Sequence, residues 1–142
     1  MHKYSVSVTH KFRGTGVALV TPFNNDSSIE FTGLNKLINH VIDGGVEYLV
    51  AMGTTGESAT LSEQERFEII DFTLAASNGR VPVVGGFGGN NTMEIIHSIQ
   101  RYKSHCSGKK YIDAILIASP YYNKPSQEGI YQHYMAIDQV VE

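Results

Sequence analysis

The sequence predicts an α/β protein with a parallel sheet, organised as the N-terminal half of a (β/α)8 TIM barrel. Apolar runs alternate with amphipathic helical patterns, which is typical of a parallel sheet covered by helices. Each unusual polar or glycine-rich stretch follows the carboxyl end of an expected strand, and this favours a barrel over an open doubly wound sheet. A full barrel takes about 250 residues, whereas these 142 residues hold about four strand–helix units.

Residues 1–13 are an N-terminal segment, and residues 14–142 form the expected half-barrel. The first strand is expected at Gly16–Val20 and the second at Glu47–Met52. Apolar residues at helical spacing predict a helix between them, ending at Gly44-Gly45, with an inner face of Leu34, Leu37, Ile38, Val41 and Ile42. A capping box of Ser62 and Glu65 begins the next helix, which ends at Asn78-Gly79 and whose inner face is expected to hold Phe67, Ile70, Leu74, Ala75 and Ala76.

The same pattern continues through two more units. The third strand is expected at Val81–Val84, with its proline at the strand start, and the fourth at Ile112–Ala118. The intervening stretch Gly85–Asn90 lacks the Gly-Lys-Ser/Thr ending of a phosphate-binding loop, so it is interpreted as a turn. Asn91 and Ser126 are expected to cap two helices with apolar faces made of Ile95, Ile96 and Ile99, and of Ile130, Tyr134, Ile137 and Val141.

Composition excludes several classes of function. The chain is 42% hydrophobic and 18% charged, as in ordinary globular proteins, and its formal net charge of −3 argues against nucleic acid as a partner. No apolar run reaches the length of a membrane span, and Met1–Arg13 lacks a signal-peptide core, so a cytoplasmic protein without a membrane partner is expected. The single Cys106 is interpreted as a helix-end thiol, and the six histidines lack ligand spacing, so neither a metal nor a cofactor is expected.

Hydroxyl groups gather at the carboxyl ends of the expected strands. The stretch Gly53-Thr54-Thr55-Gly56-Glu57 follows the second strand, where glycines permit close approach and the hydroxyl and N–H groups suit a small carboxylate or phosphate. Each residue alone also has an ordinary explanation, because Thr and Ser bond to turn backbone and Tyr rings fill cores. Together they favour a site for a small, oxygen-rich molecule, built from Thr54, Thr55, Ser58, Tyr121 and Tyr122.

Three stretches carry a resemblance to a known family: Gly14-Thr15-Gly16-Val17-Ala18-Leu19-Val20-Thr21-Pro22-Phe23, Gly53-Thr54-Thr55-Gly56-Glu57-Ser58-Ala59-Thr60-Leu61 and Ser119-Pro120-Tyr121-Tyr122-Asn123-Lys124-Pro125-Ser126-Gln127-Glu128-Gly129. They resemble the dihydrodipicolinate synthase family, within the N-acetylneuraminate lyase superfamily of pyruvate-dependent class I aldolases. The resemblance covers nearly all of the chain from Phe12 onward. N-acetylneuraminate lyases typically have Ser at the place of Thr54 and lack the Tyr-Tyr-Asn-Lys-Pro-Ser run, so they remain the alternative enzyme.

The resemblance implies a barrel enzyme that joins pyruvate to L-aspartate-4-semialdehyde in lysine biosynthesis, through a Schiff base between pyruvate and a lysine. It implies no cofactor, and a homo-oligomer. Thr55 and its backbone amide would hold the pyruvate carboxylate, and Thr54 would pass protons between two tyrosines. Tyr122 would be one of these, reaching across a dimer interface into the neighbouring subunit's site.

The resemblance also points to a lysine-effector site at the dimer interface of some relatives. Glu63 and Arg66 stand where the best-known lysine-inhibited members have histidines, which departs from the pattern of feedback inhibition. The positions that match the effector site are Ser58, Ala59, Asn90, Glu94 and Tyr121.

Two residues that the family's chemistry needs are absent from these 142 residues. The second tyrosine belongs to a Tyr-Asn-x-Pro motif after the fifth strand, and the Schiff-base lysine ends the sixth. A fragment or truncated product of a synthase, inactive alone, is therefore expected; the alternative is a non-catalytic half-barrel that self-associates through strand edges near 17–20 and 112–118. The lysines considered as substitutes lie off strand ends or in a surface loop: Lys103, Lys109, Lys110 and Lys124.

Overall fold

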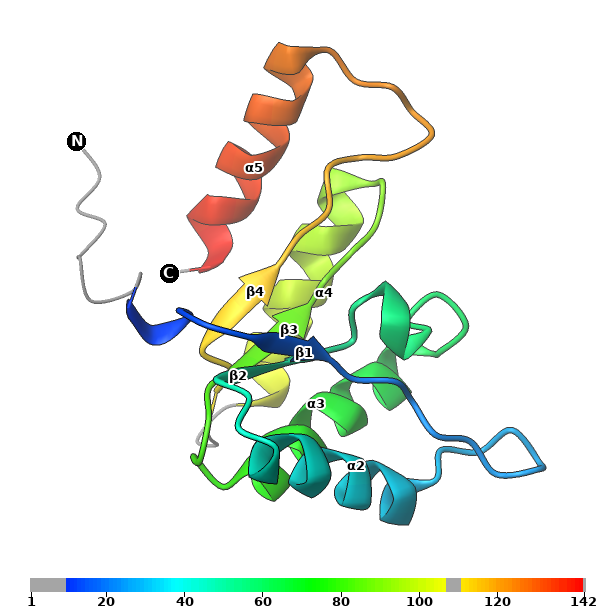
Figure 1. Cartoon of the computed structure of the whole chain (residues 1–142). Helices are drawn as coiled ribbons and strands as arrows, with labels where there is room; N and C mark the ends of the chain where they lie inside the picture. The colour runs from blue at the N-terminus through cyan, green and yellow to red at the C-terminus, as the bar shows by residue number, and fades with distance from the viewer. Residues whose placement is uncertain (1–9, 107–110, 142) are drawn as a thin grey trace.

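The computed structural model describes residues 10–106 and 111–141. The predictions for Lys109, Lys110 and most of the N-terminal segment therefore lie outside the described residues. Four parallel strands form one sheet in chain order: β1 (Gly16–Ala18), β2 (Tyr48–Ala51), β3 (Val83–Gly86) and β4 (Ala114–Leu116) (Figure 1). The sheet confirms the predicted parallel α/β architecture.

A helix follows each strand and packs on a helix next to it. Helix α2 spans Phe31–Asp43 and packs on α3, Glu63–Ser77. Helix α4, Thr92–His105, packs on α5, Gln127–Val141. A short 3-10 turn, η1, spans Thr54–Gly56 directly after β2. Within the described part of the chain, no helix is long and apolar enough to cross a membrane.

The strand register separates the two faces of the sheet. Leu49 of β2 pairs with Val83 of β3, and these side chains are 0% and 1% exposed beneath the helices. The alternate row runs Ala18, Val50, Val84 and Ala114 across the strands, and it points to the opposite face because side chains alternate along a strand. The hydrophobic core therefore lies between the sheet and the helices, as in the wall of a barrel.

Local signals for helix ends are confirmed. The Ser62 hydroxyl accepts a bond from the Glu65 N–H, and the Glu65 carboxylate accepts one of 2.8 Å from the Ser62 N–H, which is a complete capping box. Asn91 caps α4 and the Ser126 hydroxyl accepts a bond of 3.1 Å from the Gly129 N–H. After α2, Gly45 adopts a φ of 90°, a conformation in which glycine is favoured.

The third strand corrects the prediction made for residues 81–84 and for the glycines that follow. It occupies Val83–Gly86, so Gly85 and Gly86 belong to the sheet and not to a turn. A Cβ on Gly86 would lie 2.1 Å from the carbonyl oxygen of Met52, and one on Gly85 would lie 2.8 Å from Ile112. These two glycines permit the close approach of neighbouring backbone and side-chain atoms.

Two predicted helix faces also need correction. In α3, Ala75 is exposed, whereas Thr73 and Ser77 are fully buried. Their hydroxyls tolerate burial because they donate to the carbonyls of Ile69 and Val81 at 2.7 and 2.9 Å. In α5, the predicted core residue Tyr134 is 39% exposed. Its hydroxyl lies 3.1 Å from that of Ser119, and this polar contact holds the ring at the rim of the helix layer.

Candidate functional site

The turn after β2 has an unusual backbone. Met52 and Glu57 both have positive φ, 59° and 56°, although neither is glycine. Two bonds of 3.0 Å close the turn, from the Gly56 N–H to the Gly53 carbonyl and from the Glu57 N–H to the Thr54 carbonyl. Non-glycine residues in this conformation are strained and cluster at ligand sites. The predicted turn therefore lies at the carboxyl end of β2, and the positive φ values at its two ends are an addition to that prediction.

A cavity of about 360 Å³ opens beside this turn. It is lined by residues from the loops that follow β2, β3 and β4 and by Arg66 of α3, so three strand–helix units contribute to it. Four predicted site residues meet here, namely Thr54, Ser58, Ala59 and Tyr121. The remaining lining residues are Glu57, Arg66, Gly88, Gly89 and Ala118.

A second cavity of about 220 Å³ adjoins the first and shares Arg66, Gly88 and Gly89 with it. The predicted residues Asn90 and Glu94 line this second cavity. The five positions predicted for an effector site are thus divided between two neighbouring hollows.

An ion pair borders the second cavity. The Arg101 guanidinium donates to both carboxylate oxygens of Glu63, at 2.6 and 2.8 Å, and Arg66 lies 4.0 Å from the same carboxylate. The hydrogen bond from Arg101 lowers the pKa of Glu63 below its ordinary value, with smaller contributions from nearby positive charge. Glu63 is therefore held as a carboxylate between two arginines.

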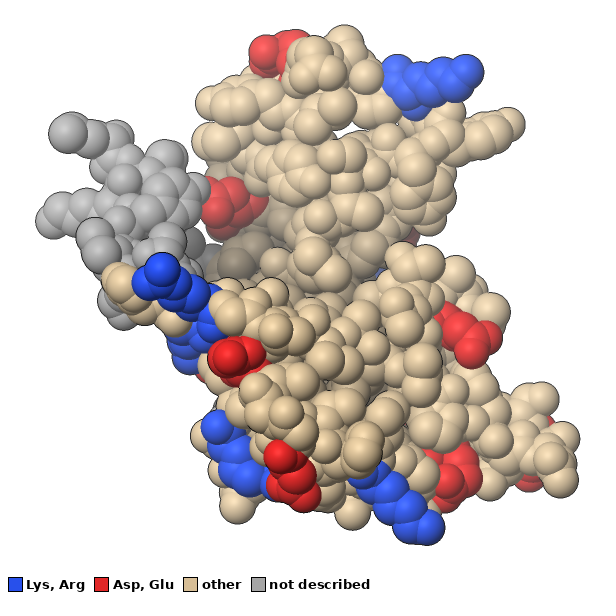
Figure 2. Space-filling model, in the orientation of Figure 1, with Lys and Arg blue, Asp and Glu red and all other residues tan. Residues whose placement is uncertain are grey.

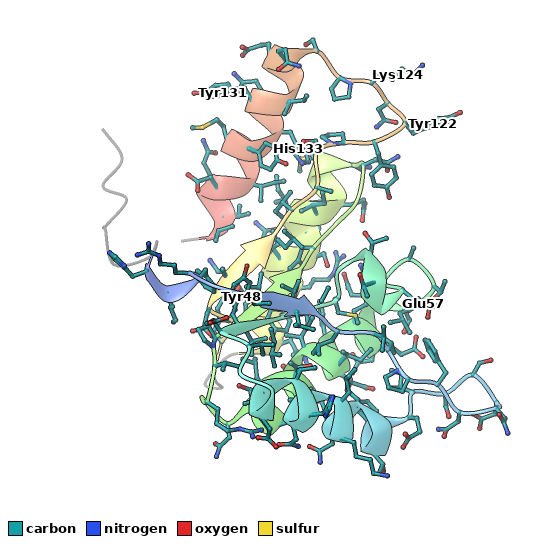
Figure 3. All side chains as sticks on the ribbon, in the orientation of Figure 1. Tyr48, Glu57, Tyr122, Lys124, Tyr131 and His133 are labelled. Carbon is teal, nitrogen blue, oxygen red and sulfur yellow. The ribbon has the colours of Figure 1, made fainter. Side chains whose placement is uncertain are left out.

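Tyr122 lies apart from both cavities. It is 91% exposed with a φ of 68°, and Figure 3 shows its side chain pointing away from the body of the protein on the loop before α5. Thr55 is exposed on its turn but does not line the cavity. Within one chain, the structure does not bring Tyr122 to Thr54, and it places Thr55 at the rim of the site.

The loop that carries Tyr122 is tied to the neighbouring unit. The Asn123 side chain donates a bond of 2.9 Å to the Asn90 carbonyl, and the Asn123 N–H donates 2.8 Å to the Tyr121 carbonyl. The buried Thr21 hydroxyl donates to the Gly56 carbonyl at 2.7 Å. The sequence alone singled out neither Thr21 nor Asn123 as a site residue. The bonds from Asn123 to Asn90 and from Thr21 to Gly56 join residues far apart in the chain, so no local sequence pattern signals them.

Two histidines, His105 and His133, contact polar groups of the helix layer and the strand ends. His133 is 3% exposed, and its ring nitrogens lie 2.8 Å from the Thr92 hydroxyl and 3.2 Å from the Ala118 carbonyl (Figure 3). His105 lies 2.9 Å from the Asp71 carboxylate. Among the described residues, no group of His, Cys, Asp or Glu side chains is arranged to hold a metal ion. The arrangement at the strand ends instead offers hydroxyls, backbone N–H groups and an arginine, which suit a small acid.

Comparison with known proteins identifies the family. The pattern of the dihydrodipicolinate synthetase family matches residues 11–141. The chain belongs to this family. Among its relatives, the 4-hydroxy-tetrahydrodipicolinate synthase of Flavobacterium psychrophilum is 53% identical over 126 residues, which is 89% of this chain and 41% of the relative. That of Cytophaga hutchinsonii is 50% identical over 128 residues, or 90% of this chain and 41% of the relative.

Solved dihydrodipicolinate synthases have the same fold over the shared region. The chloride-inhibited enzyme of Acinetobacter baumannii, complexed with pyruvate, superposes with a TM-score of 0.84 at 41% identity, covering 92% of this chain and 43% of that one. The enzyme of Thermotoga maritima gives 0.83 at 38% identity, covering 92% and 42%. The chain therefore spans about two-fifths of the length of these relatives, as expected for the N-terminal half of a (β/α)8 barrel.

Proposed function

We propose that this chain is the pyruvate-binding half of a 4-hydroxy-tetrahydrodipicolinate synthase, an enzyme of lysine biosynthesis that joins pyruvate to L-aspartate-4-semialdehyde. One observation carries the proposal. The Thr54-Thr55 turn stands at the carboxyl end of β2 beside a cavity lined by three loops, in a chain that belongs to the dihydrodipicolinate synthetase family. A relative bound to pyruvate supports the choice of ligand.

In this proposal, the backbone N–H and hydroxyl of Thr55 hold the pyruvate carboxylate, and Thr54 relays protons beside the reacting carbonyl. A threonine hydroxyl both donates and accepts a hydrogen bond, which a relay requires. Tyr122 serves a neighbouring subunit in a homo-oligomer. The position of Tyr122 supports this role, because its ring is 91% exposed on a loop with positive φ and can enter the site of another subunit.

The reaction itself requires a lysine nucleophile that forms an imine with the pyruvate carbonyl and releases water. None of the residues lining the two cavities is a lysine. Lys103 donates to the Val140 carbonyl at 2.8 Å in the outer helix layer, Lys11 pairs with Asp113, and Lys124 is exposed on the loop with Tyr122 (Figure 3). A nucleophilic lysine needs burial or a nearby cation that lowers its pKa. We propose that the 142-residue chain alone does not form the imine.

Borohydride reduction in the presence of pyruvate tests the proposal, because it traps the imine as a stable adduct visible in intact mass. No adduct is expected on this chain alone. Co-expression with the remaining part of the Flavobacterium psychrophilum relative should give an adduct on that partner. Thr55→Val should then weaken pyruvate trapping, while Thr32→Val, an exposed threonine in the first turn of α2, should not.

An adduct on the 142-residue chain alone would overturn the proposed inactivity. Equal trapping by the two threonine variants would show that Thr55 does not hold the pyruvate carboxylate. The acceptor aldehyde distinguishes the alternative enzyme, because an N-acetylneuraminate lyase activity would consume a sugar aldehyde and leave L-aspartate-4-semialdehyde unused.

We also propose that the effector-site positions of this chain bind L-lysine weakly or not at all. Arg66 lines both cavities, so it brings a positive charge to the place where an ammonium ligand would lie. Glu63 is already engaged by Arg101. Calorimetric titration with L-lysine tests this. Tight binding would show that Ser58, Ala59, Asn90, Glu94 and Tyr121 form a working effector site despite Arg66.

A further inference from the structure

His133 is a buried histidine of α5 that contacts two other segments of the chain, and it is 3% exposed. Its Nδ1 lies 2.8 Å from the hydroxyl of Thr92, the first residue of α4. Its Nε2 lies 3.2 Å from the carbonyl oxygen of Ala118, two residues after β4 (Figure 3). One imidazole ring therefore connects α5, the start of α4 and the end of β4.

The two partners of His133 assign the tautomer of its neutral ring. A carbonyl oxygen can only accept a hydrogen bond, so Nε2 carries the proton and donates to Ala118. Nδ1 then accepts from the Thr92 hydroxyl, which is able to donate. None of the ion pairs among the described residues involves His133, and Figure 2 shows few charged side chains over α5 and the loop before it. Hydrogen bonds therefore orient this ring.

The segment that His133 contacts forms part of the candidate site. Ala118 and Tyr121 follow β4 and line the cavity of about 360 Å³ beside Thr54. His133 itself lines neither this cavity nor the adjoining one. The bond from its Nε2 therefore acts on the site through the main chain of Ala118.

Other bonds to this segment are exposed to water. The Asn123 side chain donates to the Asn90 carbonyl at 2.9 Å on the surface, and the hydroxyl of Tyr134, a residue that is 39% exposed, lies 3.1 Å from that of Ser119. Water competes with such bonds, whereas a bond that is partly buried is stronger and costs more to lose. The contact from His133 is accordingly expected to contribute most to fixing the end of β4 against α5.

We propose that His133 is a positioning residue of the site, whose Nε2–H holds the main chain of Ala118 and so fixes the cavity wall that Ala118 and Tyr121 form. The bond to Thr92 has a smaller part, which is to orient the imidazole. The effect on pyruvate rests on the proposed function, whereas the effect on the order of the loop does not.

Two amide variants separate the contacts of the ring. In His133→Gln, the amide nitrogen can take the place of Nε2 and donate to Ala118. The shorter side chain of His133→Asn reaches only the place of Nδ1, so the Ala118 carbonyl loses its donor. Thr92→Val removes the other contact and is the matched control. Because His133→Asn and Thr92→Val each lose one partly buried bond, both should lower the urea concentration at which the chain unfolds.

Nuclear magnetic resonance on the 142-residue chain tests the positioning role. At pH 8, above the ordinary histidine pKa of about 6.5, nitrogen–proton correlations should show His133 protonated on Nε2. The backbone order parameters of Ala118 and Ser119 should be about 0.85 in the original chain and fall below about 0.6 in His133→Asn. They should stay near the original values in His133→Gln and Thr92→Val, although the threonine variant also loses stability.

Pyruvate trapping extends the test to the chain co-expressed with the remaining part of the Flavobacterium psychrophilum relative. His133→Asn should raise the pyruvate concentration for half-maximal trapping by about tenfold, as for one lost hydrogen bond, and His133→Gln should restore it. A proton on Nδ1, equal order parameters in the two amide variants, or equal loosening by Thr92→Val would overturn the positioning role. Absence of trapping in the original complex would instead contradict the proposed function, and the order parameters would still decide the role of His133.

Discussion

The side-chain hydroxyl of Thr21 donates a hydrogen bond of 2.7 Å to the main-chain carbonyl of Gly56. Thr21 is only 4% exposed, so its hydroxyl is largely shielded from water. The bond joins the segment after β1 to the turn after β2, across 35 positions of the chain. The position of Thr54 and Thr55 therefore depends on a residue from the preceding strand–helix unit.

Thr21→Val should lower the free energy of unfolding by about 1–3 kcal/mol, because the shape is kept while the Gly56 carbonyl loses its buried donor. Urea denaturation measures the change. Thr21→Ser retains the hydroxyl and serves as the control, with most of the stability preserved. Valine and serine variants that unfold at the same urea concentration would show that the bond contributes little.

Gly86→Ala should destabilise the protein strongly, by about 1–3 kcal/mol or more as for other overpacked sites. The added methyl group would lie 2.1 Å from the Met52 carbonyl oxygen, and a backbone atom is not easily displaced. Gly88→Ala is the control, since a Cβ there meets nothing within 4 Å. The midpoints of urea unfolding compare the two. Similar midpoints would mean that β2 moves away from β3 without penalty.

The Glu63–Arg101 pair predicts a specific dependence of stability on pH. The pKa of Glu63 is lowered in the folded protein by the hydrogen bond from Arg101. The stabilisation is therefore complete above the unfolded-state pKa, about 4.3 for glutamate, and is lost as the pH falls through the lower folded-state value. Glu63→Gln should flatten the stability profile in this acidic range. Glu68→Gln, on the same helix, provides the comparison, and identical profiles for all three proteins would contradict the prediction.

Ser62→Ala should cost about 1 kcal/mol, the usual effect of removing a helix N-cap. The alanine loses the acceptor for the Glu65 N–H at the start of α3. Thermal unfolding followed by circular dichroism measures the loss, and Ser62→Thr should restore most of it. An alanine variant as stable as the original would indicate that water replaces the serine hydroxyl at this exposed helix end.

Sequence reasoning succeeded where the cause of a structure is local. Ser62 with Glu65, Asn91 and Ser126 marked the helix starts because capping bonds span only a few residues. Alternating apolar runs likewise gave the order of strands and helices. The turn at Thr54 was found because its glycines and hydroxyls are adjacent in the chain.

Sequence reasoning failed where the cause is a contact between distant segments. Gly85 and Gly86 look like a turn in the sequence, and only the nearby Met52 and Ile112 explain why glycine occupies a strand. The bonds from Thr21 to Gly56 and from Asn123 to Asn90 cross 35 and 33 positions and have no local signature. The grouping of Arg66 with the Thr54 cavity also depends on how α3 packs.

The order of the strands in the sheet is the order of the chain. Each strand after β1 therefore finds a partner among residues already synthesised, and no later strand of the described sheet is inserted between two earlier ones. Domains generally fold N-terminal part first during translation. The sheet can accordingly grow by one edge as the polypeptide leaves the ribosome, and each new unit covers the edge left by the one before.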